Sequence, residues 1–242
     1  MPRAVRRSFV YRFGWFIGRT ILWSVALSIL WVVAYAVVPP PITFTMLGDI
    51  MGGRSVTKNW LALSAIDPDM ARAAIAAEDS KFCSHGGFDR AAIEAAMKRN
   101  AQVEANGRGR IRGCSTISQQ TAKNAFLWQG GGYVRKGLEA WFTLLIEAIW
   151  DKPRIMEVYL NIAETGIATY GVDAGAQRYF GHGAERLTPV EAARIAAVLP
   201  LPKARPATIP TGYTRRYGSA VAARIGVVRR EGLDACLYAG KN

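Results

Sequence analysis

The chain contains few cysteines and few histidines, which limits the chemistry that it can carry. Cys83, Cys114 and Cys236 are odd in number and show neither a CxxC motif nor metal-ligand spacing, so the sequence supports neither a zinc site nor a complete disulfide framework. A pair between Cys83 and Cys114 could form in an oxidising compartment, but we expect all three to be buried small apolar residues. His85 and His182 are expected to make structural hydrogen bonds rather than to bind a metal.

Acidic residues are also scarce. The chain has 18 Asp and Glu against 31 Lys and Arg, a formal net charge of +13. Five arginines lie within the first 19 residues with no acid among them, which leaves about +8 for the rest of the chain. A basic surplus suits an anionic partner, either a phosphorylated substrate or anionic lipid head groups. The alternative is a solvated basic surface without a partner.

One apolar run stands near the amino terminus. Ile21 to Val38 is uncharged, and at ~1.5 Å per residue it approaches the ~30 Å hydrocarbon thickness of a bilayer. If Arg19 snorkels, the span begins near Phe13. The run ends in a proline block from Pro39 rather than in a cleavage site, which favours a retained anchor over a cleaved signal peptide. The arginines keep the amino end in the cytoplasm, so the remainder faces outward and nucleic acid is disfavoured.

The fold class that we predict is mainly α, because polar and apolar residues rarely alternate with a period of two. Asn106 to Gly113 is rich in Gly and Arg and is expected to be mobile. The predicted organisation is a cytoplasmic basic tail over 1–12, a transmembrane anchor over 13–38, a juxtamembrane linker with some extended character over 39–59 and a catalytic domain over 60–242. Cap signals and apolar periodicity predict helices over about 68–77, 91–100, 116–127, 138–149, 154–162 and 189–198.

Three polar clusters lie between Ala77 and Asn161. In the first, Glu78 and Asp79 follow an apolar helical segment. Burial there would disfavour the ionised carboxylate and raise its pKa toward the range of a general base. The alternative is a carboxylate at a helix end that forms a salt bridge.

The second cluster crowds hydroxyl, amide and ammonium groups around one helix start. Backbone N–H groups at a helix N-terminus, with these side chains, make a receptor for phosphate oxygens. An ordinary surface helix explains the dense run of Ser, Thr and Gln poorly. The residues are Ser115, Thr116, Ser118, Gln119, Gln120, Lys123 and Asn124, with Arg108, Arg110 and Arg112 just upstream.

The third cluster places an acid beside two bases. Arg135 and Lys136 lie four and three residues before Glu139, so all three can share a helix face. The plain explanation is an ion pair within the helix. The functional explanation is a group that neutralises a departing pyrophosphate, where Glu139 with phosphate oxygens would also suit a divalent cation such as Mg²⁺ or Mn²⁺.

These motifs, in this order, resemble the peptidoglycan glycosyltransferases, and more narrowly the monofunctional biosynthetic transglycosylases of proteobacteria. The resemblance covers about Pro39 to Pro206, and a penicillin-binding transpeptidase domain would not fit in the residues after Pro206. It rests on AAEDSKF with His85 and Gly87, GCSTISQQTAKN, RKGLE with Glu147 and Lys152, IMEVYLN, GVDAGAQRYFG and LTPVEAARIAAVLPLP.

The resemblance implies a domain similar to the lysozyme fold and an inverting hexosyltransferase that polymerises lipid II. In this reaction the growing chain passes from its undecaprenyl diphosphate carrier to the 4-hydroxyl group of lipid II GlcNAc and forms β-1,4 linkages. The expected partners are lipid II, the growing glycan chain, the bacterial inner membrane and other cell-wall synthesis proteins, and no nucleic acid. The catalytic domain would be periplasmic.

Carried over residue by residue, the resemblance makes Glu78 the general base. Glu139 would hold the divalent metal or orient the leaving group, and Lys123, Arg135 and Lys136 would stabilise its charge. The positions expected to shape and support the substrate groove are Asp79, Phe82, His85, Ser115, Thr116, Gln119, Gln120, Asn124, Lys152, Tyr159 and Asn161.

Two other functions remain open from the sequence. A membrane-bound lytic muramidase would also use one glutamate on a lysozyme-like domain, but it would have no need for a pyrophosphate pocket. A scaffold that binds lipid II without catalysis would keep the pocket and would not depend on Glu78.

Overall fold

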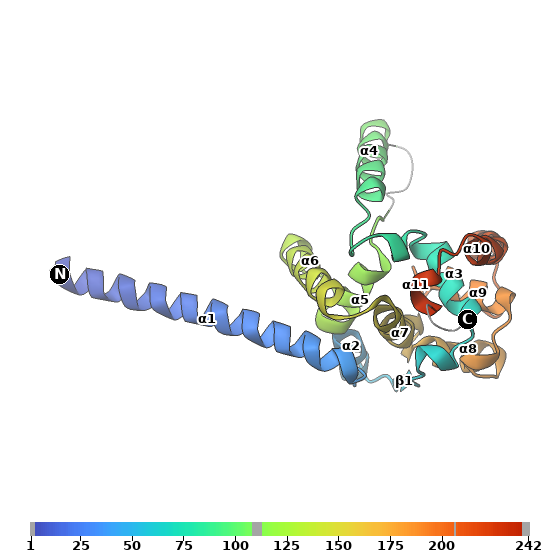
Figure 1. The fold of residues 1–242 in the computed structure, drawn as a ribbon, viewed down its shortest axis with the longest axis horizontal. Helices are drawn as coiled ribbons and strands as arrows, with labels where there is room; N and C mark the ends of the chain where they lie inside the picture. Colours follow the sequence, from blue (N-terminus) through green and yellow to red (C-terminus); the bar gives the residue numbers. More distant parts are fainter. Residues whose placement is uncertain (1–2, 108–112, 206, 239–242) are drawn as a thin grey trace. The chain divides into compact units, whose positions relative to one another are not determined.

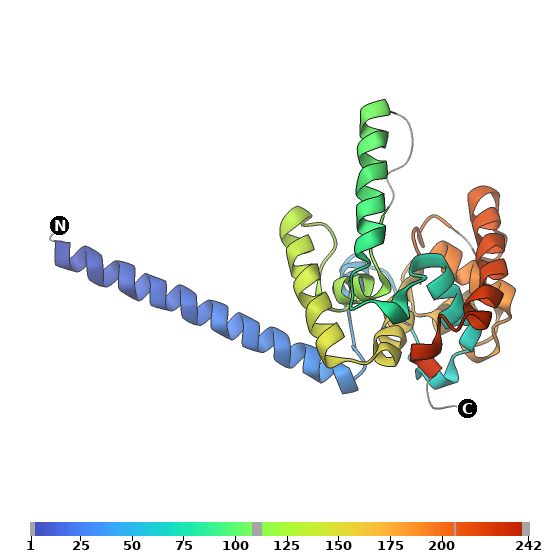
Figure 2. The same ribbon diagram turned by 45° about the horizontal axis from the view of Figure 1, so that its top comes forward.

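The computed structural model describes residues 3–107, 113–205 and 207–238, with side chains from residue 11 onward. The chain divides into two compact units, Met1–Val38 and Pro39–Asn242. The first is a single helix and the second is built of shorter helices (Figure 1, Figure 2). Arg108, Arg110 and Arg112, and most of the segment that we expect to be mobile, lie outside the described residues.

The first unit consists of helix α1, Arg3–Val37. Its stretch Tyr11–Val37 is 27 residues long, and its most apolar 18 residues have a mean hydropathy of 2.1, so the helix is long and apolar enough to cross a membrane. The hydroxyl groups of Thr20 and Ser24 each donate, at 2.9 Å, to a carbonyl group one turn earlier, so their polarity is satisfied within the helix. The helix confirms the expected apolar span, and its orientation in a membrane stays a prediction.

The second unit is mainly α-helical, as predicted, and carries one small sheet. Its α-helices are α2 (Phe44–Met51), α3 (Pro68–Glu78), α4 (Arg90–Asn106), α5 (Ile117–Phe126), α6 (Gly132–Ile149), α7 (Lys152–Ile162), α8 (Val172–Phe180), α9 (Pro189–Val198), α10 (Gly212–Arg230) and α11 (Ala235–Tyr238). Short 3₁₀ helices are η1 (Leu63–Ala65), η2 (Phe82–Ser84) and η3 (Ala184–Arg186), and the strands are β1 (Thr57–Lys58), β2 (Glu164–Gly166) and β3 (Thr169–Tyr170).

Side-chain caps fix most of the predicted helix starts. Asp67, Asp89 and Asp151 each accept a backbone N–H at the start of α3, α4 and α7. Thr116 and Thr188 form complete capping boxes at α5 and α9, as the sequence predicts. These signals are local, so the sequence locates the helices that they start.

The segment 39–59, which we expect to be a linker with some extended character, also contains a helix. Thr43 caps helix α2 within it, and Met46 and Asp49 of that helix are buried. Strand β1 follows and pairs in parallel with β3, which in turn pairs antiparallel with β2. An eight-residue helix is too short to show a clear period, which is why the sequence does not reveal it.

The helices that position the site form two packed groups. In one, α3, α9 and α10 contact one another, and in the other α5 contacts α6 and α7. Buried Ala71, Ala73 and Ala74 let the neighbours of α3 approach closely. The Ile117 N–H at the start of α5 donates to Asp79 just after α3, at 3.0 Å, so the two groups meet where α3 ends.

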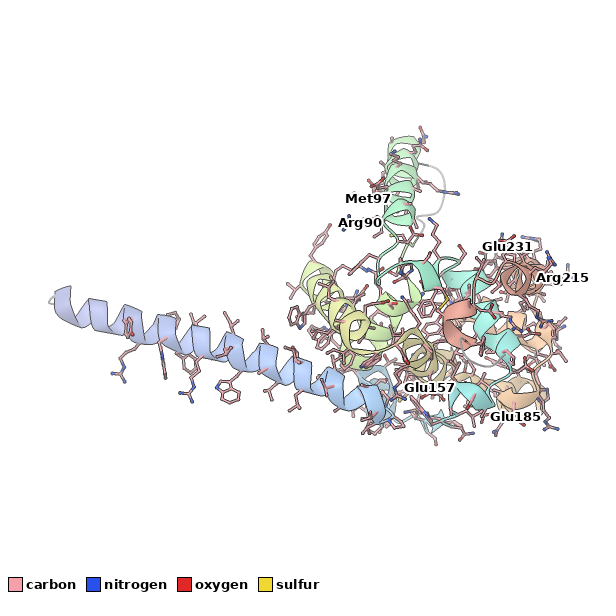
Figure 3. All side chains as sticks on the ribbon, viewed as in Figure 1. Arg90, Met97, Glu157, Glu185, Arg215 and Glu231 are labelled. Atoms are coloured by element: carbon pink, nitrogen blue, oxygen red, sulfur yellow. A yellow bond between two sulfur atoms is a disulfide. The ribbon has the colours of Figure 1, made fainter. Side chains whose placement is uncertain are left out.

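Helix α4 projects beyond these packed groups in both ribbon views (Figure 1, Figure 2). It runs past the predicted end at Asn100 to Asn106. Figure 3 places Arg90 and Met97 along it, and Met97 is exposed. Ala96 is its single buried residue in the part of the chain that the structure describes.

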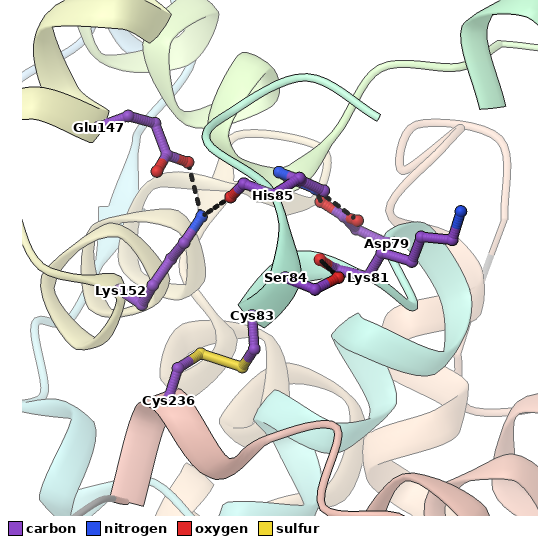
Figure 4. The surroundings of a disulfide bond; sticks show 8 residues. All are labelled: Asp79, Lys81, Cys83, Ser84, His85, Glu147, Lys152 and Cys236. Atoms are coloured by element: carbon purple, nitrogen blue, oxygen red, sulfur yellow. Dashed lines mark hydrogen bonds and ion pairs between the residues drawn. A yellow bond between two sulfur atoms is a disulfide. The ribbon is translucent and has the colours of Figure 1, made fainter. Parts of the chain in front are cut away.

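A disulfide bond joins Cys83 in η2 to Cys236 in α11, across 153 residues of sequence (Figure 4). Cys114 is a free, partly buried thiol. The expectation that all three cysteines are buried small apolar residues is therefore wrong for Cys83 and Cys236, which are bonded to each other, and the alternative pair of Cys83 with Cys114 is wrong as well. Spacing carries no information about this pair, because only the tertiary fold brings the two cysteines together.

Candidate active site

Glu78 ends α3 and faces α5. Gln120 Nε2 donates to Glu78 Oε2 at 2.8 Å. Burial raises the pKa of Glu78 above the ordinary 4.5, although the Gln120 hydrogen bond and the charge of Lys123 act to lower it. Within the described residues no basic group forms an ion pair with this carboxylate, which disfavours the salt-bridge alternative. A partly buried carboxylate with a raised pKa suits a general base, and this role of Glu78 stays a prediction.

Lys123 lies one turn after Gln120 on α5. Burial lowers its pKa, the charge of Glu139 raises it, and the charges of Arg135 and Lys136 lower it. The ammonium group therefore belongs to the same electrostatic cluster as the bases of α6. The cluster can stabilise negative charge near Glu78.

Glu139 is buried on α6 and holds both neighbouring bases. Arg135 Nη1 lies 3.0 Å from Glu139 Oε2, and Lys136 Nζ bonds to Oε1. The shared helix face that the spacing predicts is therefore present. Both oxygens of the Glu139 carboxylate already contact cationic side chains. The described residues also contain no group of three or more potential metal ligands, so the side chains around Glu139 do not form a preformed metal site. The divalent-cation requirement stays a prediction.

Asp79 and His85 support the site rather than open into it. His85 Nδ1 accepts the Gly87 N–H at 3.1 Å, so the ring proton lies on Nε2, which donates to the Asp79 carboxylate at 3.0 Å. Asp79 also accepts the Ile117 N–H. This pair fixes the turn after Glu78 onto the start of α5, and it confirms a structural hydrogen bond for His85.

Thr116 and Gln119 are likewise used internally. Thr116 Oγ1 donates to the Gly87 carbonyl at 2.7 Å, and Gln119 Oε1 accepts the Thr116 N–H at 3.1 Å. Both side chains are buried. Ser115 is closer to the bases, because its Oγ lies 3.4 Å from Lys136 Nζ. Some of the many polar side chains of this motif therefore cap the N-terminus of α5.

Lys152, Phe82 and Glu147 form a second supporting cluster, of which Figure 4 shows Lys152 and Glu147. Lys152 Nζ donates to the His85 carbonyl and to Glu147 Oε1, each at 2.8 Å, and lies 4.6 Å from the centre of the Phe82 ring. Ser118 also bonds to Glu147. Glu147 lies within the sequence motifs, but the sequence analysis assigns no role to it. A carboxylate among apolar helix positions indicates that a buried basic or hydroxyl side chain binds to it.

Asn161 is used internally, as a supporting residue would be. Its side chain exchanges two hydrogen bonds of 2.8 Å with the backbone of Leu61, donates to the Glu157 carbonyl and is buried. Tyr159 behaves differently. Its side chain is buried, and its hydroxyl group has no hydrogen-bond partner among the described residues.

A cavity of about 340 Å³ lies beside Gln120 and Lys123. Tyr159 and Asn124, both predicted to shape a substrate groove, line it, and their contact with substrate stays a prediction. Most of the other lining residues are not singled out by the sequence. Their signals are weak because they come from distant segments with no shared motif. The lining residues are Thr45, Gln120, Lys123, Asn124, Gln129, Tyr159, Ile162, Ala163, Glu164, Tyr170, Leu199, Pro200, Pro202 and Lys203.

The arrangement can therefore take a proton at Glu78 and hold negative charge at Lys123 and the α6 bases, beside a polar cavity. The family model described as Transglycosylase matches residues 45–225. A biosynthetic peptidoglycan transglycosylase of Caulobacter vibrioides is 49% identical over 203 residues, 84% of this chain and 86% of that protein. Proteins of the same name from Xanthomonas campestris pv. campestris (strain B100) and Rhodospirillum centenum are 46% and 47% identical, over 89% and 84% of this chain and 86% and 87% of their own lengths. The chain belongs to the transglycosylase family.

Proposed function

We propose that this transglycosylase polymerises lipid II into the glycan strands of peptidoglycan and releases undecaprenyl diphosphate. The family match and the names of the relatives support a glycosyltransferase acting in peptidoglycan synthesis. The observation that carries the proposal is that the carboxylate of Glu78, the general base, lies near the positive charge of Lys123. Gln120 donates a hydrogen bond to Glu78 and lies three residues before Lys123. The side chains of Gln120 and Lys123 therefore lie on one face of α5.

Glu78 acts as the general base in this proposal. Its carboxylate accepts the proton of the 4-hydroxyl group of the acceptor GlcNAc while that oxygen attacks C1 of the MurNAc at the reducing end of the donor. The bond between C1 and the pyrophosphate oxygen breaks, and the lipid diphosphate leaves with the bonding electrons. Attack from the opposite side inverts C1 and gives the β-1,4 linkage.

Lys123, Arg135 and Lys136 stabilise the charge of the departing diphosphate. Glu139 positions the last two by accepting from both. Because Glu139 is buried and hydrogen-bonded, the two bases are held in place before substrate binds, which reduces the reorganisation that charge development would otherwise require.

We also propose a single-pass protein of the inner membrane, with its amino terminus in the cytoplasm and its catalytic unit in the periplasm. The apolar stretch of α1 and the arginines before it support this orientation. The disulfide bond adds independent support, because such bonds persist in oxidising compartments. An anchor also raises the effective concentration of an enzyme whose lipid-linked substrate stays in the bilayer.

The test is an assay of the full chain in detergent micelles with lipid II, and separately with finished sacculi. Glycan polymer from lipid II supports synthesis, whereas soluble fragments from sacculi would indicate a lytic enzyme. Glu78→Gln is expected to abolish polymer formation while the thermal unfolding midpoint stays near that of the wild type. The matched control is Glu185→Gln on η3, an exposed residue at the edge of the molecule (Figure 3).

Near-wild-type turnover by Glu78→Gln would contradict the role of the carboxylate. Binding of lipid II without turnover in the wild-type protein would favour the scaffold instead. The two results are distinct, because the first concerns one residue and the second concerns catalysis by the whole site.

A further inference from the structure

Two helices hold the end of α3, where Glu78 lies. On α5, Gln120 donates to the Glu78 carboxylate, and the proposed function uses this contact. On α10, the hydroxyl group of Tyr217 donates to the backbone carbonyl group of Ala77 at 2.6 Å, across 140 positions of sequence. Ala77 directly precedes Glu78 in the chain. The proposed function assigns a role to the contact from α5 and none to the contact from α10.

The Ala77 carbonyl group belongs to the last turn of α3. The last four carbonyl groups of an α-helix have no partner within the helix, and they carry the negative end of its dipole. The N–H of Asp79 donates to the Ile75 carbonyl at 3.1 Å, and Tyr217 donates to that of Ala77. A carboxylate close to such a helix end has its ionised form disfavoured. The Tyr217 hydroxyl group therefore fixes the backbone of this turn and offsets part of its negative charge.

Tyr217 stays a neutral hydrogen-bond donor at neutral pH. Burial raises its pKa to about 12, and the charge of Glu78 also acts to raise it. The hydroxyl group is thus within electrostatic reach of the Glu78 carboxylate. A second polar contact between α10 and α3, from Arg229 to Asp69 at 2.6 Å, lies in the first turn of α3. The two helices are therefore joined elsewhere, and the contact of Tyr217 falls beside the proposed base.

The ring of Tyr217 is held by neighbouring side chains. Tyr213 lies one turn earlier on α10, and the two ring centres are 5.6 Å apart with an interplanar angle of 16°. The guanidinium group of Arg205 lies 5.0 Å from the centre of the Tyr213 ring, and Arg205 Nη1 donates to the Ala197 carbonyl of α9 at 3.2 Å. Stacking and cation–π contacts of this kind stabilise one orientation of the rings. The Tyr217 hydroxyl group is therefore in place before substrate binds.

We propose that Tyr217 is a positioning residue of the transfer reaction, whose hydroxyl group fixes the backbone that carries Glu78 and keeps the carboxylate within reach of the acceptor hydroxyl group. The inference rests on the proposed function and adds a residue to its mechanism. Tyr217 acts through Ala77 and does not touch substrate. Such control matters because a misplacement of about 1 Å can slow a reaction by roughly a hundredfold.

The charged and titratable groups that couple to Glu78 come from several elements. They are Lys123 on α5, Asp79 after α3, Arg205 after α9, Tyr159 on α7 and Tyr217 on α10. Beyond the effect of burial, the charges of Lys123 and Arg205 lower the pKa of Glu78 and the charge of Asp79 raises it. Loss of the Tyr217 hydroxyl group leaves these charges in place and removes the donor from the helix end, so the pKa of Glu78 should rise further.

The test is Tyr217→Phe in the full chain in detergent, assayed with lipid II over a series of pH values. We expect kcat to fall about tenfold and KM to change less than about twofold, because the groups proposed to bind substrate are untouched. The acidic limb of the pH profile of kcat/KM should shift to higher pH by up to about 0.5 unit. Lipid II binding to the Glu78→Gln protein, measured at equilibrium without turnover, should be the same with and without Tyr217→Phe.

Tyr179→Phe is the matched control. Tyr179 Oη donates to the Thr165 carbonyl at 2.8 Å, so this variant also removes one hydrogen bond from a partly buried tyrosine to the backbone. Tyr179 lies on α8 and is not among the groups that couple to Glu78. The unfolding midpoint is expected to fall by a similar amount in both variants. The value of kcat and the acidic limb should change in Tyr217→Phe alone.

Wild-type kcat and an unmoved acidic limb in Tyr217→Phe would overturn the inference even with a lower midpoint, because the hydroxyl group would then only join α10 to α3. Equal losses of kcat in Tyr217→Phe and Tyr179→Phe would overturn it as a general effect of stability. Weaker lipid II binding in the Glu78→Gln background would overturn it too, because Tyr217 would then contact substrate.

Failure of the proposed function gives a different result. A wild-type protein that does not polymerise lipid II, or near-wild-type turnover by Glu78→Gln, would refute that function. Both measurements are made with Tyr217 unchanged, so they are distinct from the outcomes that concern Tyr217.

Discussion

The disulfide bond between Cys83 and Cys236 should contribute a large share of the stability of the catalytic unit. A cross-link removes conformations from the unfolded chain, and the effect grows with the length of the closed loop. For a separation of 153 residues the chain-entropy model gives an upper value of about 5 kcal/mol. Measured effects of disulfide bonds are more often roughly 2–4 kcal/mol, which is the change that we expect for Cys236→Ser.

Native contacts around α11 support this estimate, because they should keep the folded state intact without the cross-link. Arg72 Nε pairs with the buried Asp234 at 2.7 Å, and Leu237 is buried. The loss of stability in Cys236→Ser then arises mainly because the unfolded chain gains conformations. For a chain of this size, 2–4 kcal/mol corresponds to a fall of about 4–16 °C in the unfolding midpoint.

The assay is thermal unfolding of the full chain in detergent, with and without a dithiol reductant. Cys114→Ser is the matched control, because this cysteine is free and its loss should leave the midpoint nearly unchanged. Alkylation of the unfolded wild-type protein should label one thiol before reduction and three after it. Equal midpoints for Cys236→Ser, Cys114→Ser and the wild type would refute the reasoning, as would three reactive thiols before reduction.

Three further predictions concern the active site. Because the ionised carboxylate of Glu78 is the base, kcat/KM should rise with pH as Glu78 loses its proton, at a pH set by its raised pKa. Gln120→Leu removes a hydrogen bond that lowers this pKa, so the acidic limb of the pH profile of kcat/KM should shift to higher pH. An acidic limb that does not move would argue against Glu78 as the titrating group. Gly87→Ala should lower the unfolding free energy by about 1–3 kcal/mol, because Gly87 has φ +90° and a Cβ there would lie 2.8 Å from Thr143 Cγ2. Gly86→Ala is the control, because a Cβ at Gly86 meets open space. If a divalent cation joins the diphosphate, a chelator should lower the initial rate with lipid II and excess Mg²⁺ should restore it; an unchanged rate would count against the cation.

The sequence predicts what is local and misses what depends on the tertiary fold. The capping boxes at Thr116 and Thr188 are read within four residues, and both are present. The partner of Cys83 and the contact of Asp49 with Tyr170 join residues more than a hundred positions apart, so no spacing rule reveals them. The contact of Glu78 with Gln120 is intermediate, because the order of motifs suggested one site but gave no geometry.

The polar run at α5 shows why this motif needs so many hydrogen-bonding residues. Thr116 and Gln119 turn back to cap the helix, and Ser118 bonds to Glu147. Gln120, Lys123 and Asn124, spaced at three and four residues, line the cavity on another face.

The first turns of α5 thus build the helix start, anchor α6 and present the ligand-facing groups. Each task falls on a different face, because a rotation of about 100° per residue separates neighbouring side chains. Sequence reasoning counted all of these residues as one receptor for phosphate. The helical geometry instead divides them, so replacing Gln119 should cost stability, whereas replacing Lys123 should cost binding of the leaving group.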